Sequence, residues 1–283
     1  MNRFAGYRHA SWVLVCLLSG CGAPPATLDI GEYKDGQKHG SWTHLFESGK
    51  KKSTGSYDMG KPVGEWITFH SSGEKATQCE YADGKKHGVY QAWHPNGKPE
   101  ETGSYENGKK NGPWETWGPE GTKLSEGSYQ DGQRQGTWKF FGFYGVTEGE
   151  FQADEKQGKW VEWEGNLQLS GIYRNGQRDG VWMTSTTDGV KVKEGTYQAG
   201  KPTGTWTAWN GEGKVYSVTE YASGRQHGKH VGYHPNGQKR EEGQFAQGKQ
   251  IGKWTRWDAE GNEIKKKPKR VDFTDLLAEE TGE

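Results

Sequence analysis

The chain has 283 residues with equal numbers of basic and acidic side chains, 37 of each, and a mean hydropathy of −1.08. Only 30% of the residues are hydrophobic, yet 45 are Gly, 14 are Trp and 13% are aromatic. A low apolar fraction is typical of disordered chains, whereas zero net charge and many large rings favour a folded protein that concentrates its burial in those rings. The balanced charge gives no basis for long-range attraction to nucleic acid, so we expect no nucleic-acid partner.

Residues 1–20 have the organisation of a secretory signal peptide. Arg3 and Arg8 form a basic start, and residues 10–18 form an apolar run that is too short to span a bilayer permanently. The run ends in the letters LSGC, with Cys21 last, and resembles the lipobox of bacterial lipoproteins. This resemblance implies cleavage before Cys21 and lipidation of its sulfur. We therefore expect a membrane-anchored lipoprotein of the bacterial cell envelope, in the outer membrane if the source is Gram-negative; the alternative is a plain cleaved signal.

Cysteine usage provides no framework of cross-links. Cys16 lies in the segment that would be removed and Cys21 would carry the lipid, which leaves Cys79 as the remaining thiol. The mature chain therefore has no intrachain disulfide and no Cys-based metal site. We expect Cys79 to be a small, packed side chain.

The rest of the chain is a repeat array. An aromatic residue recurs every 24 residues, except for two steps of 22 residues that flank Phe151. The residues of this series are Tyr33, Tyr57, Tyr81, Tyr105, Tyr129, Phe151, Tyr173, Tyr197, Tyr221 and Phe245. If each repeat is numbered from this residue, position 8 is Gly in all ten copies, position 4 is Gly in nine, and position 10 is Trp in eight. Such a fixed period predicts a repeat architecture.

Each repeat is predicted to form one β-hairpin, because Trp, Tyr, Phe, Val and Thr favour strands. Runs such as Pro95-Asn96-Gly97 would join the two strands of a hairpin, and pairs such as Asn107-Gly108 would join one hairpin to the next. The expected fold is all-β, an elongated single antiparallel meander on the order of 100 Å long. Position 13 is aromatic in eight copies and differs in parity from position 10, so aromatic side chains should lie on both faces unless a bulge intervenes.

At these residues the chain resembles a known family. The letters DGKKHGVY at 83–90 and NGKKNGPW at 107–114, each followed by an aromatic residue and a Gly turn, are similar to MORN repeats. They are most similar to the bacterial MORN variant that is often labelled as antitoxin-like. The resemblance covers residues 31–264 and implies an elongated, twisted sheet of hairpins that acts as a scaffold or an interaction surface.

Two distant segments are similar in sequence. Residues 94–114 read HPNGKPEETGSYENGKKNGPW, and residues 234–254 read HPNGQKREEGQFAQGKQIGKW. They could be a duplicated site or two copies of a structural unit, and their register with the repeat favours the structural unit. Repeats one to four match repeats seven to ten, so the two 22-residue repeats lie between similar halves. We expect a bend or a widened groove at 129–172.

Three histidines have a spacing that resembles a metal site. His227, His230 and His234 lie three and four residues apart, but on a turn and a strand this spacing would scatter them. We therefore expect no metal ligands.

Acidic pairs are the remaining candidates for chemistry. Glu100-Glu101 and Glu241-Glu242 precede corresponding strands, but neighbours on a strand point to opposite faces, so we expect each to pair with Lys across the sheet. Nucleophile elbows, zinc-protease motifs and phosphate loops are missing from the sequence. We expect no catalytic residues, no cofactor and no enzymatic activity.

These observations divide the chain into a signal peptide at 1–20, a linker at 21–30, ten repeats at 31–264 and a basic, then acidic, tail at 265–283. We expect a lipid-anchored interaction scaffold that binds a protein partner; the alternatives are glycan or peptidoglycan binding through aromatic columns and antitoxin-like neutralisation of a partner. Neither a ligand nor an oligomeric state follows from the sequence, because exposed edge strands leave end-to-end association open. The candidate contact residues occupy position 13 and are Trp93, Trp117, Trp209, Tyr233 and Trp257.

Overall fold

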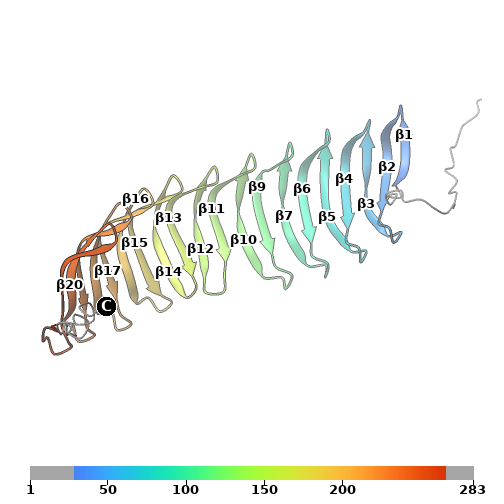
Figure 1. Ribbon diagram of the computed structural model, residues 1–283. Coiled ribbons are helices and arrows are strands. Elements are labelled where there is room, and N and C mark those ends of the chain that lie inside the picture. Colours follow the sequence, from blue (N-terminus) through green and yellow to red (C-terminus); the bar gives the residue numbers. More distant parts are fainter. Residues whose placement is uncertain (1–28, 266–283) are drawn as a thin grey trace, which may run out of the picture.

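The computed structural model describes residues 29–265 as one open antiparallel sheet, shown in Figure 1, and no helix occurs in this range. The expected signal peptide, Cys21 and nearly all of the expected tail lie outside the described residues. None of the elements within 29–265 is a helix that could cross a membrane. The strands are β1 Asp29–Lys34, β2 Gln37–Leu45, β3 Lys51–Asp58, β4 Lys61–Phe69, β5 Lys75–Ala82, β6 Lys85–Trp93, β7 Pro99–Glu106, β8 Lys109–Lys110, β9 Gly112–Trp117, β10 Lys123–Gln130, β11 Gln133–Phe141, β12 Val146–Gln152, β13 Glu155–Glu164, β14 Leu167–Arg174, β15 Gln177–Thr186, β16 Lys191–Gln198, β17 Lys201–Trp209, β18 Val215–Ala222, β19 Arg225–Tyr233, β20 Lys239–Ala246 and β21 Lys249–Arg256.

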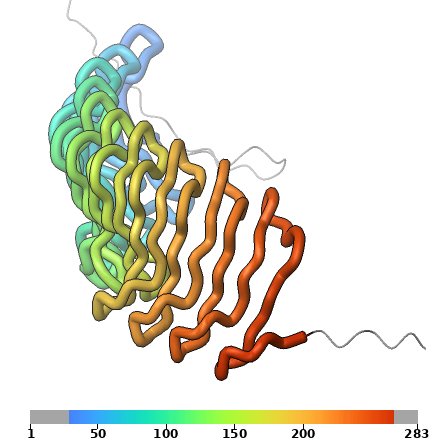
Figure 2. Tube along the Cα trace, turned by 90° about the vertical axis from the view of Figure 1, so that its left-hand side faces the viewer, coloured from blue at the N-terminus to red at the C-terminus, as the bar shows by residue number. Residues whose placement is uncertain are grey.

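The sheet is a meander in which strands that follow one another along the chain are also neighbours in space. β8 and β9 are the two parts of one strand, since both pair with β7. The predicted all-β meander with two strands per repeat is confirmed. In Figure 2 the C-terminal strands fan out toward the viewer while the N-terminal strands stack behind one another, which shows that the row of strands twists along its length.

One long edge of the sheet is formed by two-residue turns at positions 3 and 4 of every repeat. Both residues have positive φ, as at Asn107 (51°) and Gly108 (85°), which is the type I′ geometry that Asn-Gly and Asp-Gly favour. Asp154 is the only residue other than Gly at position 4, and its φ is 69°. Its carboxylate accepts hydrogen bonds from the backbone N–H and the Nε of Arg134, at 3.0 and 2.8 Å. These bonds offset the cost of placing a Cβ in the left-handed region.

Position 8 carries a bulge that explains its Gly. Between β1 and β2 the register shifts, so that Ile30 pairs with Thr43 while Glu32 pairs with His39. Gly40 lies inside the widened part with φ of 70°, and the Gly at position 8 of every other repeat also has positive φ. The left-handed backbone requires Gly here because any other residue would be strained.

The core is a single column of rings on one face of the sheet, because a one-layer sheet has no second layer to pack against. Each Trp at position 10 lies flat over a Gly of the preceding strand, two residues before the next position 1, which is position 23 in a 24-residue repeat. A Cβ added to Gly103 would overlap the indole ring of Trp114, which is only 1% exposed. The same pairing occurs eight times, at Gly31–Trp42, Gly55–Trp66, Gly103–Trp114, Gly127–Trp138, Gly149–Trp160, Gly171–Trp182, Gly195–Trp206 and Gly243–Trp254.

In two repeats both members of the Gly–Trp pair change together. Cys79 replaces the Gly where Tyr90 replaces the Trp, and the two residues are partners across β5 and β6. Thr219 replaces the Gly where His230 replaces the Trp, and their side chains are hydrogen bonded at 2.7 Å between Oγ1 and Nδ1. A smaller ring therefore leaves room for a small side chain beneath it. Cys79 is 3% exposed, which confirms that it is a packed residue.

The aromatic residues at position 1 fill the gaps between successive Trp rings. Tyr57 makes edge-to-face contacts with both neighbours, at ring-centroid distances of 5.8 Å to Trp42 and 4.9 Å to Trp66. Similar contacts recur along the sheet, and each contributes roughly 0.5–1.5 kcal/mol beyond its burial. We call the residues of positions 1 and 10 the aromatic column.

The two short repeats lose one residue in the turn and one in the returning strand. In a 24-residue repeat the register shifts beside the turn and leaves an extra residue, as Lys52 between Lys51 and Ser53, whereas the short repeats pair here without a shift. The Gly142 N–H donates to the Gly145 carbonyl at 3.0 Å across a two-residue turn, Phe143–Tyr144, and Glu164 pairs directly with Leu167. Pairing continues from β10 through β15, so the widened groove predicted at 129–172 is wrong, while the bend given as its alternative stays a prediction.

The paired exceptions predict a rescue. Tyr90→Trp places a larger ring over Cys79 and should lower the free energy of unfolding by about 1–3 kcal/mol, the usual cost of overpacking. The double variant Tyr90→Trp/Cys79→Gly recreates the pair found in eight repeats and should recover most of this loss. Urea unfolding followed by Trp fluorescence measures both. Equal destabilisation in the single and double variants would contradict the coupling of the two positions.

Candidate interaction surface

The face that carries the aromatic column is closed by cations. In six of the ten repeats position 6 is a Lys or Arg that lies over the rings: Lys110 Nζ is 3.9 Å from the centre of the Trp114 ring, and the Arg134 guanidinium is 3.9 Å from that of Phe151. Cation–π contacts of this kind contribute about 0.5–2 kcal/mol each, depending on their exposure. Because six of the eight Trp rings of position 10 are buried, the column stabilises the sheet and leaves little of these rings open to a ligand.

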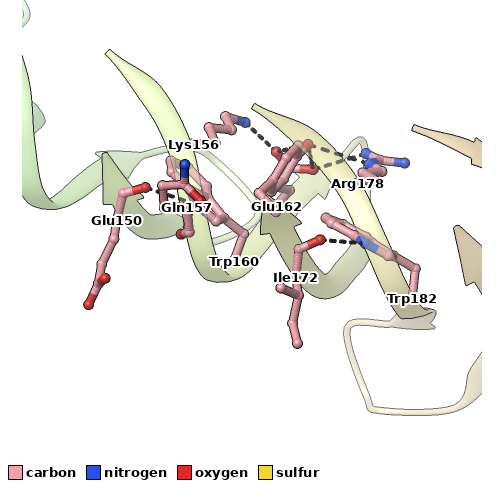
Figure 3. Close-up of polar contacts among 9 residues, drawn as sticks. Glu150, Lys156, Gln157, Trp160, Glu162, Ile172, Arg178 and Trp182 are labelled. Carbon is pink, nitrogen blue, oxygen red and sulfur yellow. Dashed lines mark hydrogen bonds and ion pairs between the residues drawn. The ribbon is translucent and has the colours of Figure 1, made fainter. Parts of the chain in front are cut away.

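The most extensive polar cluster lies on this face at the middle of the array, as Figure 3 shows. Glu162 accepts hydrogen bonds from Lys156, from Arg178 Nη2 at 2.9 Å and from the Tyr173 hydroxyl at 3.0 and 3.1 Å. Burial by itself would raise the pKa of Glu162, but these bonds outweigh it and lower the pKa. A carboxylate so fully paired is a poor proton acceptor, and its role is to hold two cations over the column.

The predicted pairing with Lys is confirmed for Glu101 and Glu242, whereas Glu241 pairs with Arg instead. On the column face, Glu101 accepts hydrogen bonds from Lys110 Nζ at 2.7 Å and Trp114 Nε1 at 2.8 Å. Glu241 and Glu242 also part: Glu241 pairs with Arg240, and Glu242 with Lys229 and Lys239. The carboxylates of a pair do not face a common cleft.

The histidines connect neighbouring repeats. His94 Nε2–H donates to the carbonyl of Trp117 at 2.9 Å, and His70 and His234 make the equivalent bonds at 2.7 and 2.8 Å. Since a carbonyl can only accept, Nε2 carries the hydrogen. Within residues 29–265 no group of three or more His, Cys, Asp or Glu is arranged to hold a metal ion.

The bonds from these turns account for the likeness of the two similar segments. Asn96 Nδ2 donates to the Pro119 carbonyl at 2.7 Å, and Asn236 Nδ2 donates to the Ala259 carbonyl at 2.6 Å. Each His-Pro-Asn-Gly turn therefore binds the backbone of the following repeat twice. The likeness of residues 94–114 to 234–254 marks two structural clamps of the same kind.

The five predicted contact residues lie at the ends of the strands that lead into the longer turns. Trp93, Trp117, Trp209, Tyr233 and Trp257 are all half-buried. Trp257 lines a groove of about 530 Å³ together with Lys253 and Thr255 of the face opposite the column, as the parity of position 13 predicts. Strand pairing brings the five into one row, and successive repeats are separated by about 10 Å, the width of two strands. We call this row, with the turns beside it, the long-turn edge.

Lysine side chains lie against four of these rings. The Nζ atoms of the Lys residues at position 19 are 5.3–5.8 Å from the ring centres, in the pairs Lys75–Trp93, Lys123–Trp117, Lys191–Trp209 and Lys239–Trp257. Three of these Lys residues also pair with a Glu at position 22. Each of these four rings therefore has one face partly covered by a Lys side chain, and in three of them a Glu pairs with that Lys.

The most exposed aromatic residue of the described chain is one that the sequence analysis did not select. Phe143 is 95% exposed at the tip of the turn between β11 and β12, and Tyr144 beside it is 49% exposed. Their rings meet edge to face at 5.0 Å. The signal was present in the sequence, because this repeat lacks two residues and places aromatic residues where other repeats have Gly, Asn, Ser or Pro.

With this geometry in hand, the comparisons with known proteins can be placed on the structure. A family model described as a MORN repeat variant matches residues 86–107 and 226–247. Each segment begins at position 6 of one repeat, contains a long turn, and ends at position 3 of the next. No curated protein matches the chain. The match indicates a repeat-based binding scaffold at these segments.

Two solved structures share a distant likeness. They are crystal structures of TcdB2-TccC3-TEV, with 10% identity over 82% of this chain and a TM-score of 0.18, and of TcdB2-TccC3-Cdc42, with 12% identity over 74% and a TM-score of 0.16. The aligned region spans 15% and 13% of those chains. Such TM-scores are too low for the likeness to bear on fold or function.

The buried tyrosines predict lability in alkali. Burial, with a smaller contribution from Glu101, raises the pKa of Tyr90 and Tyr105 to about 12. An unfolded Tyr ionises near its ordinary value of about 10, so between these values the unfolded state binds fewer protons and stability falls as pH rises. Urea unfolding at increasing pH should show this loss.

Tyr105→Phe should make the loss shallower. Phe already occupies position 1 at Phe151 and Phe245, so the variant should fold. A stability that does not change between pH 10 and pH 12 in the unsubstituted protein would contradict the assigned burial.

Proposed function

We propose that this chain is a lipid-anchored scaffold of the bacterial cell envelope, without enzymatic activity, which binds a protein partner along its long-turn edge. In this proposal the MORN-type repeat extends through all ten hairpins, beyond the two segments that the family model matches. The proposal is supported by the regular surface of the long-turn edge, on which successive repeats are about 10 Å apart. Its aromatic residues come from separate hairpins that strand pairing holds in register.

The observation that carries the proposal is the exposure of Phe143. An aromatic side chain that is 95% exposed contributes nothing to the core, and keeping its ring in water is unfavourable compared with burying it. Aromatic residues at the centre of an interface typically supply a large share of the binding energy. Phe143 and Tyr144 lie at the middle of the array, with half-buried Trp residues of the same edge on both sides.

The environment of the row favours a protein over a glycan. Stacking on a sugar requires an open, planar ring face, whereas four of the five predicted rings lie under a Lys. Side chains of both charges surround these rings, and such a mixed rim suits the polar margin of a protein interface. Neutralisation of a toxin-like partner would be one case of such binding.

Replacing the exposed tip should abolish binding without affecting the fold. Phe143→Ala/Tyr144→Ala is expected to lose the partner recovered by crosslinking in intact cells, and its melting temperature should stay close to that of the unsubstituted protein. Asn166→Ala is the matched control, because Gly165–Asn166 forms the two-residue turn of the next repeat without an aromatic residue. Unchanged recovery of a partner from the double variant would refute a role for the tip, and retention on purified peptidoglycan would favour the glycan alternative.

The proposed anchor constrains how the sheet meets the membrane. β1 begins at Asp29, eight residues after Cys21, and a fully extended chain of that length reaches about 28 Å at most. The N-terminal end of the sheet would therefore stay near the bilayer.

Removing the lipid should change location and leave folding intact. Cys21→Ser is expected to move the protein from the membrane fraction to the soluble fraction, because acyl chains contribute about 0.8 kcal/mol per buried methylene. Labelling with a fatty-acid analogue should be lost in the same variant. A Cys79→Ser variant serves as control and should keep both label and location; labelling that persists in Cys21→Ser would contradict the assigned anchor.

A further inference from the structure

Strands inside the sheet pair in one constant register, and among the described residues each end strand lacks a full partner on its outer side. In nine places the first strand of a hairpin pairs with its second strand in the same register: position 8 lies opposite position 1 of the next repeat, and positions 9 and 10 lie opposite the two residues before it, which are 24 and 23 in a 24-residue repeat. An example is Gly40 with Tyr57, Ser41 with Ser56 and Trp42 with Gly55. The other eight pairs repeat this pattern across the whole array.

The C-terminal end has a first strand whose second strand is barely begun. After β21 the chain turns back, and the Ile264 N–H donates to the Arg256 carbonyl at 2.7 Å, next to a bridge between Trp257 and Glu263. Within residues 29–265, no strand covers the outer edge of residues 252–255. A groove of about 570 Å³ lies along this edge and is lined in part by Trp254.

At the N-terminal end, β1 corresponds to the second strand of a hairpin, and no first strand pairs with its outer edge among residues 29–265. β1 carries Gly31 at position 23 and Tyr33 at position 1, and all six of its residues are exposed. Tyr33 is 64% exposed and contacts one Trp ring, that of Trp42 at 5.1 Å. By comparison, Tyr57 lies between two.

We propose that β1 of a second copy of this chain adds to the outer edge of β21 and continues the sheet in phase. In the register of the interior pairs, Gly31 lies opposite Trp254, Glu32 opposite Lys253 and Tyr33 opposite Gly252. The incoming Tyr33 then takes the place beside Trp254 that position 1 takes beside every interior Trp.

The facing side chains agree with this register. Glu32 and Lys253 carry opposite charges, and Lys253 is 81% exposed, with Glu263 only at 3.9 Å. Opposite charges directly across a strand pair stabilise it by roughly 0.2–1 kcal/mol, whereas like charges destabilise it. Ile30, 60% exposed, would face Thr255 on the same added strand.

The chain's own continuation is a poorer match for the same edge. In phase, Pro268 would stand at position 24 and Lys269 at position 1, where every repeat has an aromatic residue. A Pro lacks the backbone N–H that a strand donates, and a Lys cannot fill the gap beside Trp254. The edge is therefore better completed by a second copy than in cis.

The contact joins two different surfaces of the molecule, so it does not close on itself. Such head-to-tail contacts generate open rows. Each added copy would lengthen the sheet by ten repeats and extend the long-turn edge of the previous copy.

Sedimentation of the full chain over a range of concentrations tests this contact. We expect multimers that grow with concentration, and both Lys253→Glu and Glu32→Lys should shift the distribution to the monomer mass. The double variant Glu32→Lys/Lys253→Glu restores opposite charges and should restore the multimers. Lys159→Glu is the matched control: Lys159 is an exposed position 9 residue on β13, which has strands on both sides, so the multimers should persist.

Three outcomes would overturn the proposal. The first is a monomer at every soluble concentration. The second is multimers that neither single charge reversal dissociates, which would place the contact elsewhere, such as between two copies of β1. The third is a monomeric full chain that forms multimers only after deletion of 266–283, which would show that the chain's own tail occupies the edge.

Discussion

The contact between a Trp ring and the bare backbone of a Gly is the interaction on which this sheet depends. A single layer of strands has no opposing layer, so its apolar groups must find cover on the sheet itself. A flat indole over Gly103 or Gly171 buries the ring and shields the backbone hydrogen bonds beneath it. The Gly of position 8 and the Trp of position 10 lie in the same bulge, which in the first repeat is flanked by the paired residues His39 and Thr43. The aromatic ring of position 1 fills the gap between successive Trp rings. Turns, bulge and column therefore form one device that is repeated ten times.

The same device determines where function can lie. The column face is filled by rings and cations, and its carboxylates are paired, as Glu162 shows. What remains free is an edge, where strand ends deliver aromatic residues at regular intervals, and one turn where aromatic residues face water. Binding by such a molecule relies on length and spacing, since the described chain presents shallow, open grooves along its surface.

Periodicity made most of the fold predictable. Asn-Gly and Asp-Gly pairs marked the short turns, and parity placed positions 10 and 13 on opposite faces. The Gly–Trp contact was beyond reach, because it depends on how far a bulge moves a ring over the neighbouring strand. Cys79 was correctly predicted to be small and packed. Its contact with Tyr90 was not predicted, because it too depends on the position of a ring over the neighbouring strand. The widened groove failed because each short repeat loses one residue from a turn and one from a bulge, and neither loss interrupts strand pairing. At the candidate site the sequence indicated the position 13 residues and the unusual aromatic turn, but the degree of burial of each ring depends on packing that the sequence pattern does not give.

The Gly–Trp contact also has a direction. Each ring reaches back over the strand that precedes it, so a Gly always leaves the ribosome before the Trp that will cover it. Gly31 is followed by Trp42, and Gly243 by Trp254, in the same order as every pair between them. A growing array can therefore seal each repeat as soon as the next hairpin emerges, without waiting for distant sequence. The order of these contacts along the chain therefore matches the order in which the chain is synthesised.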